Sequence, residues 1–474
     1  MTNKTLISGV PSVVNAGIDI FSILMKEAGA RVIDLPWKPP LGGDLDLYRR
    51  LFGLGSAGPS VARLEIGNAR VVKAMLEADP VAIDLVPAAS VMPALQNRML
   101  LHAGPPLDYA RMTDTMRGAA AGALLFEGWA KDREEAELLL ASGSIPFDSC
   151  HHHGAVGPMV GIISPSMPVF VVKDSKSGRC AYSTINEGIG AVMRFGASGP
   201  EVIERLQWFA SSFGPLLGAA LRRSGGLPLK PLMAKALLMG DEMHQRNTAA
   251  SLLFCKELMP HLVAVGSGDD LERAVGFLLE TEQFFLNLAM CAGKIMGDSG
   301  QLVGEGSIVT AMCRNGVDFG IRVSGLGDRW WTAPVNTPTG LYFAGFSGED
   351  ASPDLGDSAI LETVALGGMA LPAAPAVLGF VGAGTFKRGV ELFERLQGFT
   401  VSINPAWTIP ALDGRAVPFG IDIRQVVATG IEPLINTGIA HKQAGRGQIG
   451  AGTVTAPLGC FEAACRELGV KLEG

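Results

Sequence analysis

The pattern of apolar residues changes twice along this chain, and these changes limit the folds it can adopt. In the first hundred residues, short apolar runs at 5–10, 31–35 and 81–86 alternate with segments of helical period at 18–28 and 68–77. Gly29 stands between a predicted helix and strand, where a left-handed cap is expected. Strands that alternate with helices are typical of a parallel sheet. We therefore predict an N-terminal Rossmann-like domain over residues 1–112.

The pattern becomes helical after Met112 and returns to a glycine-punctuated α/β pattern after Ser299. A chain of 474 residues exceeds the roughly 250–300 residues that one core supports. We predict a helix pair (115–130 and 132–141) with a His- and Gly-rich site segment over 113–199. A helical domain is expected over 200–298, with helices at 201–222, 230–262 and 271–296, and a glycine-rich C-terminal α/β domain over 299–474.

The composition excludes several functional classes. Charged residues make up only 18% of the chain against 48% hydrophobic ones, so apolar surface must be buried in cores or against other chains, including copies of this one. The net charge of −7 gives no basic footprint for nucleic acid. The longest uncharged stretch, 363–386, is too interrupted by glycine and proline for a membrane span. Seven scattered cysteines without a CxxC pair suit reduced thiols, so we expect a cytoplasmic protein.

Three adjacent histidines, His151, His152 and His153, follow Asp148 and Cys150. Neighbouring side chains on an irregular backbone alternate in direction, so at most two of the three face one site. We predict His151 and His152 to be catalytic and expect no bound metal. A metal site would need further donors, with Asp241 and His244 the obvious ones. The alternative is a buried polar turn satisfied by backbone carbonyls.

A polar stretch at 240–247 interrupts an otherwise apolar helical pattern. Helical spacing would place Asp241, His244, Asn247 and Ser251 along one stripe. An unpaired buried polar group costs about 1–3 kcal/mol, so the stripe must line a cavity or face solvent. We predict that Asp241 orients His244 as a general acid–base, and that Arg246 and Asn247 bind substrate.

Further candidates for anion binding lie in glycine-rich segments. Glu187 and Arg194 belong to one at 186–196, where a guanidinium can grip a carboxylate or phosphate through two hydrogen bonds, although a plain turn fits equally well. Arg329 ends a second glycine-rich segment, at 324–329, and Lys442 lies near the start of a third, at 441–447. Residues 354–358 are expected to cap a helix over 358–369, or to leave its N-terminus for an anion. The first turn, at Gly9, lacks the GxGxxG fingerprint of dinucleotide binding.

Several long segments, in order, resemble the YlbE-like family, which was long catalogued as a domain of unknown function. The resemblance runs along nearly the whole chain. Its carriers are WKPPLGG at 37–43, LHAGPP at 101–106, CHHHGAVGP at 150–158, NEGIGAVMRFG at 186–196, GDEMHQRN at 240–247, DLGDSAILE at 354–362 and TGIAHK at 437–442.

The resemblance implies a Rossmann-like N-terminal domain, a small helical domain and further α/β domains. One branch of the family is a subunit of a three-component oxamate carbamoyltransferase of anaerobic allantoin breakdown. Its companions are an FdrA-like subunit, itself similar to acyl-CoA synthetases, and a third small subunit. That enzyme splits oxalurate with phosphate into oxamate and carbamoyl phosphate. The resemblance implies no redox cofactor and carries over no residue roles.

The candidate residues are compatible with this chemistry. Two small anions need cationic clamps, and the leaving nitrogen needs a proton. The clamps are expected from Arg194, Arg246, Arg329 or Lys442, and the proton from His151, His152 or His244. This requires the histidine turn and the polar stripe to face one enclosed pocket. Two alternatives stay open: a non-catalytic scaffold for an FdrA-like partner, and a metal-dependent amidohydrolase that uses the histidines and Asp241.

Overall fold

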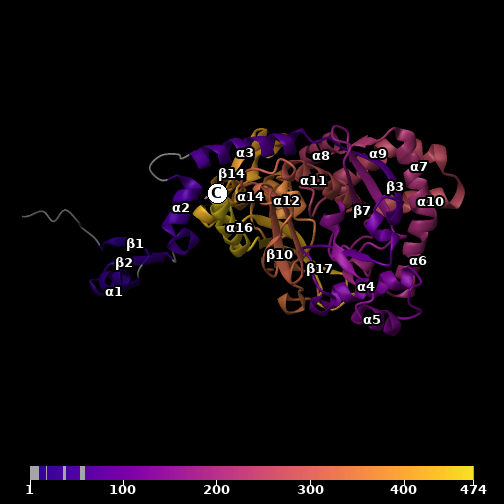
Figure 1. The fold of residues 1–474 in the computed structure, drawn as a ribbon, viewed down its shortest axis with the longest axis horizontal. Helices are drawn as coiled ribbons and strands as arrows, with labels where there is room; N and C mark the ends of the chain where they lie inside the picture. Colours follow the sequence, from indigo (N-terminus) through magenta and orange to yellow (C-terminus); the bar gives the residue numbers. More distant parts are fainter. Residues whose placement is uncertain (1–9, 18, 36–38, 54–58, 473–474) are drawn as a thin grey trace, which may run out of the picture.

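The protein, described here by a computed structural model over residues 10–17, 19–35, 39–53 and 59–472, has a mixed α/β fold (Figure 1). The predicted fold class is confirmed: a parallel strand pair lies near the N-terminus, helices dominate the middle, and strands with helices make up the C-terminal part. The division into four domains remains a prediction.

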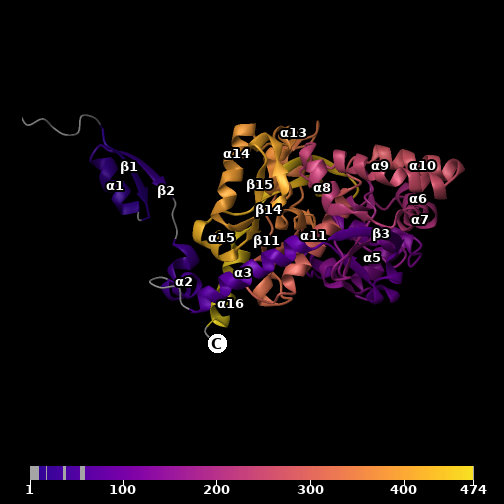
Figure 2. The same cartoon turned by 90° about the horizontal axis from the view of Figure 1, so that it is seen from above.

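A small unit occupies the N-terminal end. Strands β1 (Ser12–Ala16) and β2 (Arg31–Leu35) pair in parallel and are joined by helix α1 (Asp19–Glu27). Gly29 takes the predicted left-handed conformation after α1, with φ of +82°. The strand expected at 5–10 falls almost wholly outside the described residues. Figures 1 and 2 both show this unit standing apart from the rest of the molecule.

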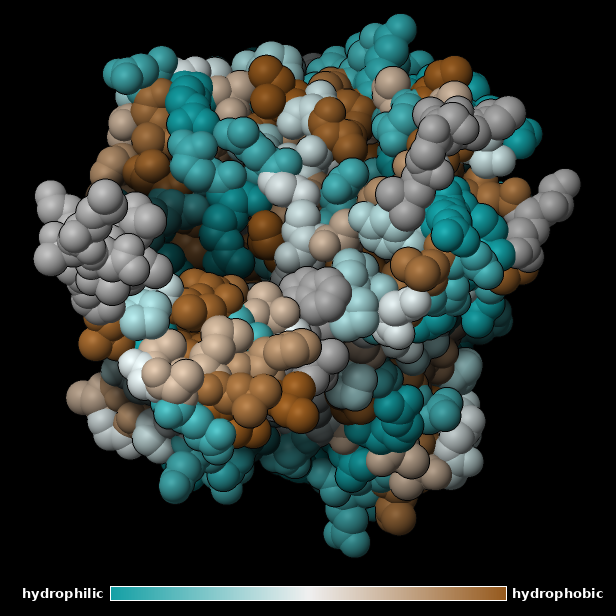
Figure 3. Space-filling model, turned by 90° about the vertical axis from the view of Figure 1, so that its left-hand side faces the viewer, coloured by the Kyte–Doolittle hydropathy of each residue, from teal (hydrophilic) through white to brown (hydrophobic). Residues whose placement is uncertain are grey.

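Much of the apolar surface of this unit is exposed. Val14, Phe21, Leu24 and Ile33 are each more than half exposed, at 60, 54, 57 and 54%. Figure 3 looks at the molecule from this end and shows tan and brown side chains gathered over the unit. Parallel sheets are normally covered on both faces, and two strands alone are marginally stable. The unit therefore has the surface of an element that packs against something else.

The third strand of the predicted Rossmann-like pattern joins a different sheet. Strand β3 (Pro80–Pro87) lies where a strand was predicted but is half-buried, and it pairs antiparallel with β6 (Pro168–Asp174) and β8 (Leu227–Pro228). Strand β7 (Cys180–Thr184) completes this sheet in the order β7-β6-β3-β8. A second parallel pair, β4 (Leu100–His102) with β5 (Phe147–Ser149), leads into the histidine turn.

Helices occupy most of the segments predicted as helical, although the single helix expected over 271–296 is broken at 281–285. Around β3 and the middle of the chain they are α2 (Leu45–Phe52), α3 (Pro59–Glu77), α4 (Asp114–Phe126), α5 (Arg133–Ala141), α6 (Pro200–Trp208), α7 (Gly214–Ser224), α8 (Leu229–Leu238), α9 (Thr248–Val265), α10 (Gly268–Glu280) and α11 (Leu286–Gln301). The helix expected over 230–262 is two helices, α8 and α9, separated by a loop. Helix α11 is almost fully buried and packs against α3, β7 and β9 (Val309–Asn315).

Among the described helices, α9 has the length and apolar composition to cross a membrane. However, 44% of it is buried inside the protein, and a core helix passes the same test, so this is weak evidence for a span.

Antiparallel sheets dominate the C-terminal part. One has the order β11 (Trp331–Pro334), β10 (Asp318–Val323), β9 and β13 (Leu355–Gly356). A second joins β12 (Thr339–Tyr342), β17 (Gln448–Thr455) and β16 (Leu434–Ala440), and β14 (Thr400–Ile409) pairs with β15 (Arg415–Ile421). The helices here are α12 (Ile360–Thr363), α13 (Pro375–Phe380), α14 (Phe386–Arg395), α15 (Ile423–Thr429) and α16 (Leu458–Lys471).

Glycine is required where β12 meets β17. A Cβ on Gly340 would lie 2.1 Å from the carbonyl oxygen of Ala451. Most of the glycine-rich stretch after residue 430 forms strands β16 and β17, which pair as a hairpin.

Candidate functional site

A loop at 239–247 replaces the helix predicted there. The fully buried Glu242 carboxylate accepts hydrogen bonds from the backbone N–H groups of His244, Gln245 and Arg246, at 3.0, 2.6 and 2.7 Å. Asp241 accepts one from the N–H of Ala250 at 2.8 Å. These side chains take donors that a helix would have paired with carbonyls. The helical stripe expected from the spacing is therefore wrong.

Asp241 does not orient His244. Its other carboxylate oxygen accepts a hydrogen bond from the Nε of Arg246, at 3.1 Å. Burial raises the pKa of both Asp241 and Glu242, and the backbone N–H groups that they bind work against that rise. The loop thus holds the guanidinium of Arg246 through a buried carboxylate, and His244 has a different partner.

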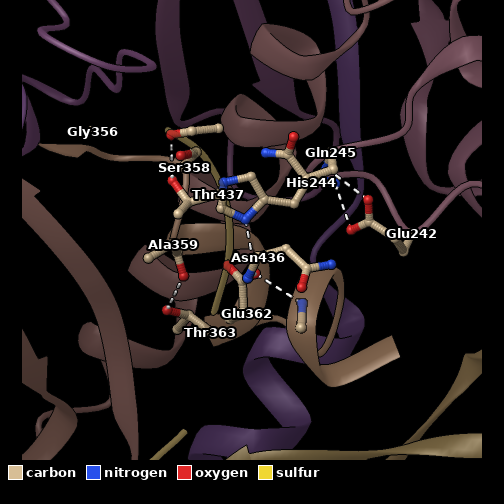
Figure 4. Close-up of polar contacts among 12 residues, drawn as sticks. Glu242, His244, Gln245, Gly356, Ser358, Ala359, Glu362, Thr363, Asn436 and Thr437 are labelled. Atoms are coloured by element: carbon tan, nitrogen blue, oxygen red, sulfur yellow. Dashed lines mark hydrogen bonds and ion pairs between the residues drawn. The ribbon is translucent and has the colours of Figure 1, made fainter. Parts of the chain in front are cut away.

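That partner is Glu362 on α12, which the sequence analysis missed. The Nδ1 of His244 lies 2.8 Å from its Oε1, and Figure 4 shows the ring with Glu362 on one side and Ser358 and Thr437 on the other. The same oxygen accepts the N–H groups of Gly368 and Asn436. A signal was present in the sequence: Glu362 is the last charged residue before the uncharged stretch 363–386, and a buried acid needs partners.

Several buried polar atoms near this pair have no hydrogen-bond partner within the described part of the chain. They are the Oε2 of Glu362, both amide atoms of Asn436 and the Oδ1 of Asn247. Buried polar groups are rarely left unpaired. Donors and acceptors are thus available here for water or a small polar ligand.

An open cleft of about 810 Å³ lies in front of the loop. Its lining includes residues 187–192, 245–248 and 280–283, with Phe343 and Phe380. Three predicted substrate-binding residues, Glu187, Arg246 and Asn247, therefore meet in one place although they come from segments far apart in the sequence. The Arg246 side chain is 39% exposed, so its guanidinium is accessible from the cleft.

Arg194 connects two segments that line this cleft. Its Nε donates to the carbonyl of Gly188 at 2.7 Å and its Nη2 to the Oε1 of Gln283 at 3.0 Å, and both partners line the cleft. Glu187 in turn accepts the backbone N–H groups of Met193 and Arg194. Burial lowers the pKa of Arg194 to about 10 and raises that of Glu187. The pair joins the two walls of the cleft.

The histidine turn does not line this cleft. Residues 150–153 form a short 3-10 turn in which the buried His151 faces Asp357, with 3.5 Å between Nε2 and Oδ1. His152 and His153 both contact the carboxylate of Asp148, at 2.7 and 2.9 Å. The expectation that the histidine turn and the 240–247 segment share one pocket is wrong for this cleft.

The segment 354–362 connects to both regions instead of capping a helix. Asp357 accepts the N–H groups of Gly104 and Gly157, at 2.7 and 3.0 Å, and Asp354 pairs with the buried Arg314. Helix α12 has no side-chain cap, so the predicted cap is wrong. Through Asp357 and Glu362, one segment contacts both His151 and His244.

Two other predicted anion ligands lie elsewhere. The guanidinium of Arg329 lies over the ring of Trp331, 4.3 Å from its centroid, and Lys442 donates to the carbonyl of Glu349 at 2.6 Å. Neither lines the cleft. One group of potential metal ligands is found among the described residues: His151, Cys313 and Asp357, whose ligand atoms all lie within 4.8 Å of one another.

Comparison with known proteins identifies the family. A family model described as oxamate carbamoyltransferase subunit AllG matches residues 145–358. The chain is 51% identical over 404 residues to the Escherichia coli (strain K12) protein of that name, covering 85% of this chain and 96% of the relative. The chain belongs to the AllG family.

Two further similar proteins have no stated function. The uncharacterized protein YahG of Escherichia coli (strain K12) is 39% identical over 475 residues, which cover 99% of this chain and all of YahG. A crystal structure of a conserved protein of unknown function from Enterococcus faecalis V583 has a TM-score of 0.85 and 41% identity, covering 86% of this chain and 98% of that one. The AllG match at 145–358 spans the histidine turn, the 240–247 loop and Asp357.

Proposed function

We propose that this chain is a subunit of an oxamate carbamoyltransferase that interconverts oxalurate and phosphate with oxamate and carbamoyl phosphate. The observation that carries the proposal is the 51% identity that extends over 96% of AllG. In the phosphorolytic direction, a phosphate oxygen attacks the terminal ureido carbon. The carbon–nitrogen bond to the oxamyl group breaks, and the departing nitrogen takes up a proton.

The cleft supplies groups suited to holding two anions. Arg246 and Arg205 provide positive charge at its lining, and Gln245 and Asn247 provide amide groups. Bringing two anions together is itself a large part of catalysis, because it removes the entropy of their encounter. We assign Arg246 to the carboxylate or phosphate, with Asp241 holding its guanidinium in place.

His244 is assigned to proton transfer. A carboxylate on Nδ1 fixes the tautomer of an imidazole and leaves Nε2 to accept or donate a proton. Glu362 stands in this position, 2.8 Å from Nδ1. His244 also directly precedes Gln245 and Arg246, which line the cleft.

Partner subunits, one FdrA-like and one small, belong to this proposal. Support comes from the N-terminal unit, whose apolar side chains are exposed and whose two strands, within the described part of the chain, pair only with each other. A partner that adds strands to this parallel pair would cover its edges and faces. The same observation favours the alternative in which the chain is a non-catalytic scaffold.

The test uses this chain assembled with its partner subunits. Carbamoyl phosphate formed from oxalurate and phosphate is measured for the wild type, for Arg246→Ala and for His244→Asn. We expect each variant to lose about 100-fold or more in kcat/KM, since removing one charge-stabilising or proton-transferring group typically costs that much. Arg388→Ala, which alters an exposed α14 ion pair outside the cleft, is the matched control.

A complex of correct composition in which Arg246→Ala and His244→Asn together leave turnover unchanged would overturn the catalytic assignment and support the scaffold. Absence of carbamoyl phosphate with the wild-type complex would overturn the proposed reaction.

A further inference from the structure

Three side chains that commonly bind metals meet outside the cleft. His151 stands on the turn after β5, Cys313 on β9, and Asp357 directly after β13. One ligand atom of each lies within 4.8 Å of the other two. The side chains of His151 and Asp357 are fully buried, as is Cys313. The three come from parts of the chain that are distant in sequence, so the fold itself brings them together.

Hydrogen bonding leaves these residues free to bind a ligand. Neither ring nitrogen of His151 has a hydrogen-bond partner in the described part of the chain, although both are buried. The thiol of Cys313 is free. The N–H groups of Gly104 and Gly157 orient the carboxylate of Asp357, and each of its oxygens keeps a second lone pair. A buried imidazole without partners is costly, and a bound cation would occupy one of its two unpaired nitrogens.

We propose that His151, Cys313 and Asp357 bind a zinc ion. Imidazole nitrogen, thiolate sulfur and carboxylate oxygen are the ligands that zinc takes in proteins, whereas magnesium and calcium prefer oxygen alone. In a tetrahedral site with bonds of about 2.0–2.3 Å, neighbouring ligand atoms lie roughly 3.3–3.8 Å apart. The present atoms, with 3.5 Å between His151 and Asp357, are within about 1 Å of that arrangement.

The charges balance at this site. Zinc binding releases the proton of the Cys313 thiol to solvent, and the resulting thiolate and the Asp357 carboxylate together neutralise the ion. The nearby ammonium of Lys294 is already paired with Asp298, at 2.6 Å. The ring of Trp330 packs edge-on against His151, with centroids 5.2 Å apart.

The ion connects parts of the chain that are distant in sequence. It ties the histidine turn to β9 and to the segment after β13, and so joins the middle of the chain to the C-terminal sheet. Three protein ligands leave one position for water. The inference is independent of the proposed reaction, because none of the three residues lines the cleft. It also removes His151 from the proton-transfer role expected from the sequence.

The first experiment measures metal content. Full-length protein is purified without chelators or a histidine tag, and zinc is quantified by inductively coupled plasma mass spectrometry. We expect about one zinc per wild-type chain, and a loss of at least about tenfold in Cys313→Ser and in His151→Gln. His153→Gln is the matched control, because His153 belongs to the same turn but contacts Asp148. Wild-type protein free of zinc, or both ligand variants retaining it, would overturn the proposal.

A second measurement does not depend on a variant that folds. Wild-type protein is stripped with a chelator and titrated with Co²⁺, and a thiolate-to-cobalt absorption band saturating at about one ion per chain is expected. The melting temperature should fall on stripping and return on addition of Zn²⁺. A titration without a thiolate band, or a melting temperature that chelation leaves unchanged, would show that no ion is held by Cys313.

Discussion

At the scale of single residues, buried carboxylates that bind backbone N–H groups shape both regions described above. Glu242 accepts three such groups, and Asp357 and Glu362 accept two each. In segments without regular structure, these side chains satisfy donors that would otherwise be unpaired. Each carboxylate therefore fixes the backbone conformation of its segment as well as contributing charge.

The meeting of Glu187, Arg246 and Asn247 was predictable as a set of candidates, because polar residues in apolar or glycine-rich surroundings need a reason to be there. The partner of His244 was not predictable from spacing. The choice of Asp241 assumed a helix, whereas Glu362 arrives through a contact 118 residues away in the sequence. Local spacing carries no information about such a contact.

We predict that Glu362→Gln lowers kcat of the assembled enzyme by about 10- to 100-fold, since a hydrogen bond to a charged group contributes about 1.5–3 kcal/mol. The glutamine oxygen can still accept the N–H groups of Gly368 and Asn436, so the melting temperature should change little. Glu305→Gln, which alters an exposed pair with Arg70, is the control. An unchanged kcat would contradict the role given to the His244–Glu362 pair.

A pH dependence is predicted for His102, which is fully buried with Nδ1 2.8 Å from the carbonyl of Ala103. Burial lowers its pKa from the ordinary 6.5. Below about pH 6.5 the unfolded chain binds a proton that the folded chain does not, so stability falls as the pH falls, by up to about 1.4 kcal/mol per pH unit.

The measurement compares unfolding free energies of the wild type and His102→Gln at about pH 7.5 and about pH 5.5. The loss on acidification should be smaller in the variant. Equal losses in both proteins would show that this imidazole does not contribute.

At the scale of elements, helix positions follow from local periodicity, and most of those expected are present. Helices α4 and α5 lie close to their predicted bounds. Strand pairing is a non-local property, so the sequence predicted the strand itself but not its partners. Strand β3 was recognised as a strand, but its antiparallel partners at 168–174 and 227–228 could not be read from its own sequence.

The packing of α11 on β9 leads to a prediction for Gly297. A Cβ at this position would lie 2.2 Å from the carbonyl oxygen of Thr310, a backbone atom that cannot rotate away. We expect Gly297→Ala to lower the free energy of unfolding by about 2–3 kcal/mol, as overpacking does. Denaturant unfolding of the variant and the wild type measures this difference in free energy.

Gly276→Ala in α10 is the matched control, because nothing lies within 4 Å of a Cβ there. Removing a glycine from an open helix position should stabilise the protein by about 0.5–1 kcal/mol. Similar effects in the two variants would contradict the close approach of α11 to β9.

At the scale of the whole molecule, the N-terminal unit differs from the rest of the protein, here called the body, in how well its apolar residues are buried. The body buries a continuous core, whereas the unit stands apart and exposes its apolar residues. The alignment with AllG covers 96% of AllG but 85% of this chain, so part of this chain has no aligned counterpart in that relative.

We therefore predict that removing residues 1–37 leaves the melting temperature of the body unchanged within about 2 °C, which corresponds to roughly 2 kcal/mol in a chain this long. The truncated chain should lose co-purification with the partner subunits. A large drop in melting temperature would show that the unit supports the body, and retained co-purification would place the partner surface elsewhere.

The contacts of Asn68 on α3 join segments that the ribosome makes at widely separated times. Its side chain bonds Ser307 and Asp422, and the second partner lies 354 residues further along the chain. At about 5–20 residues per second, roughly 20–70 s pass before a ribosome has made both ends of that contact. Until α11 has been made, the apolar face of α3, with Val71 and Met75 fully buried in the finished protein, lacks the helix against which it packs. The yield of folded protein should therefore depend on how quickly the last third of the message is translated and on chaperones that shield the nascent helix.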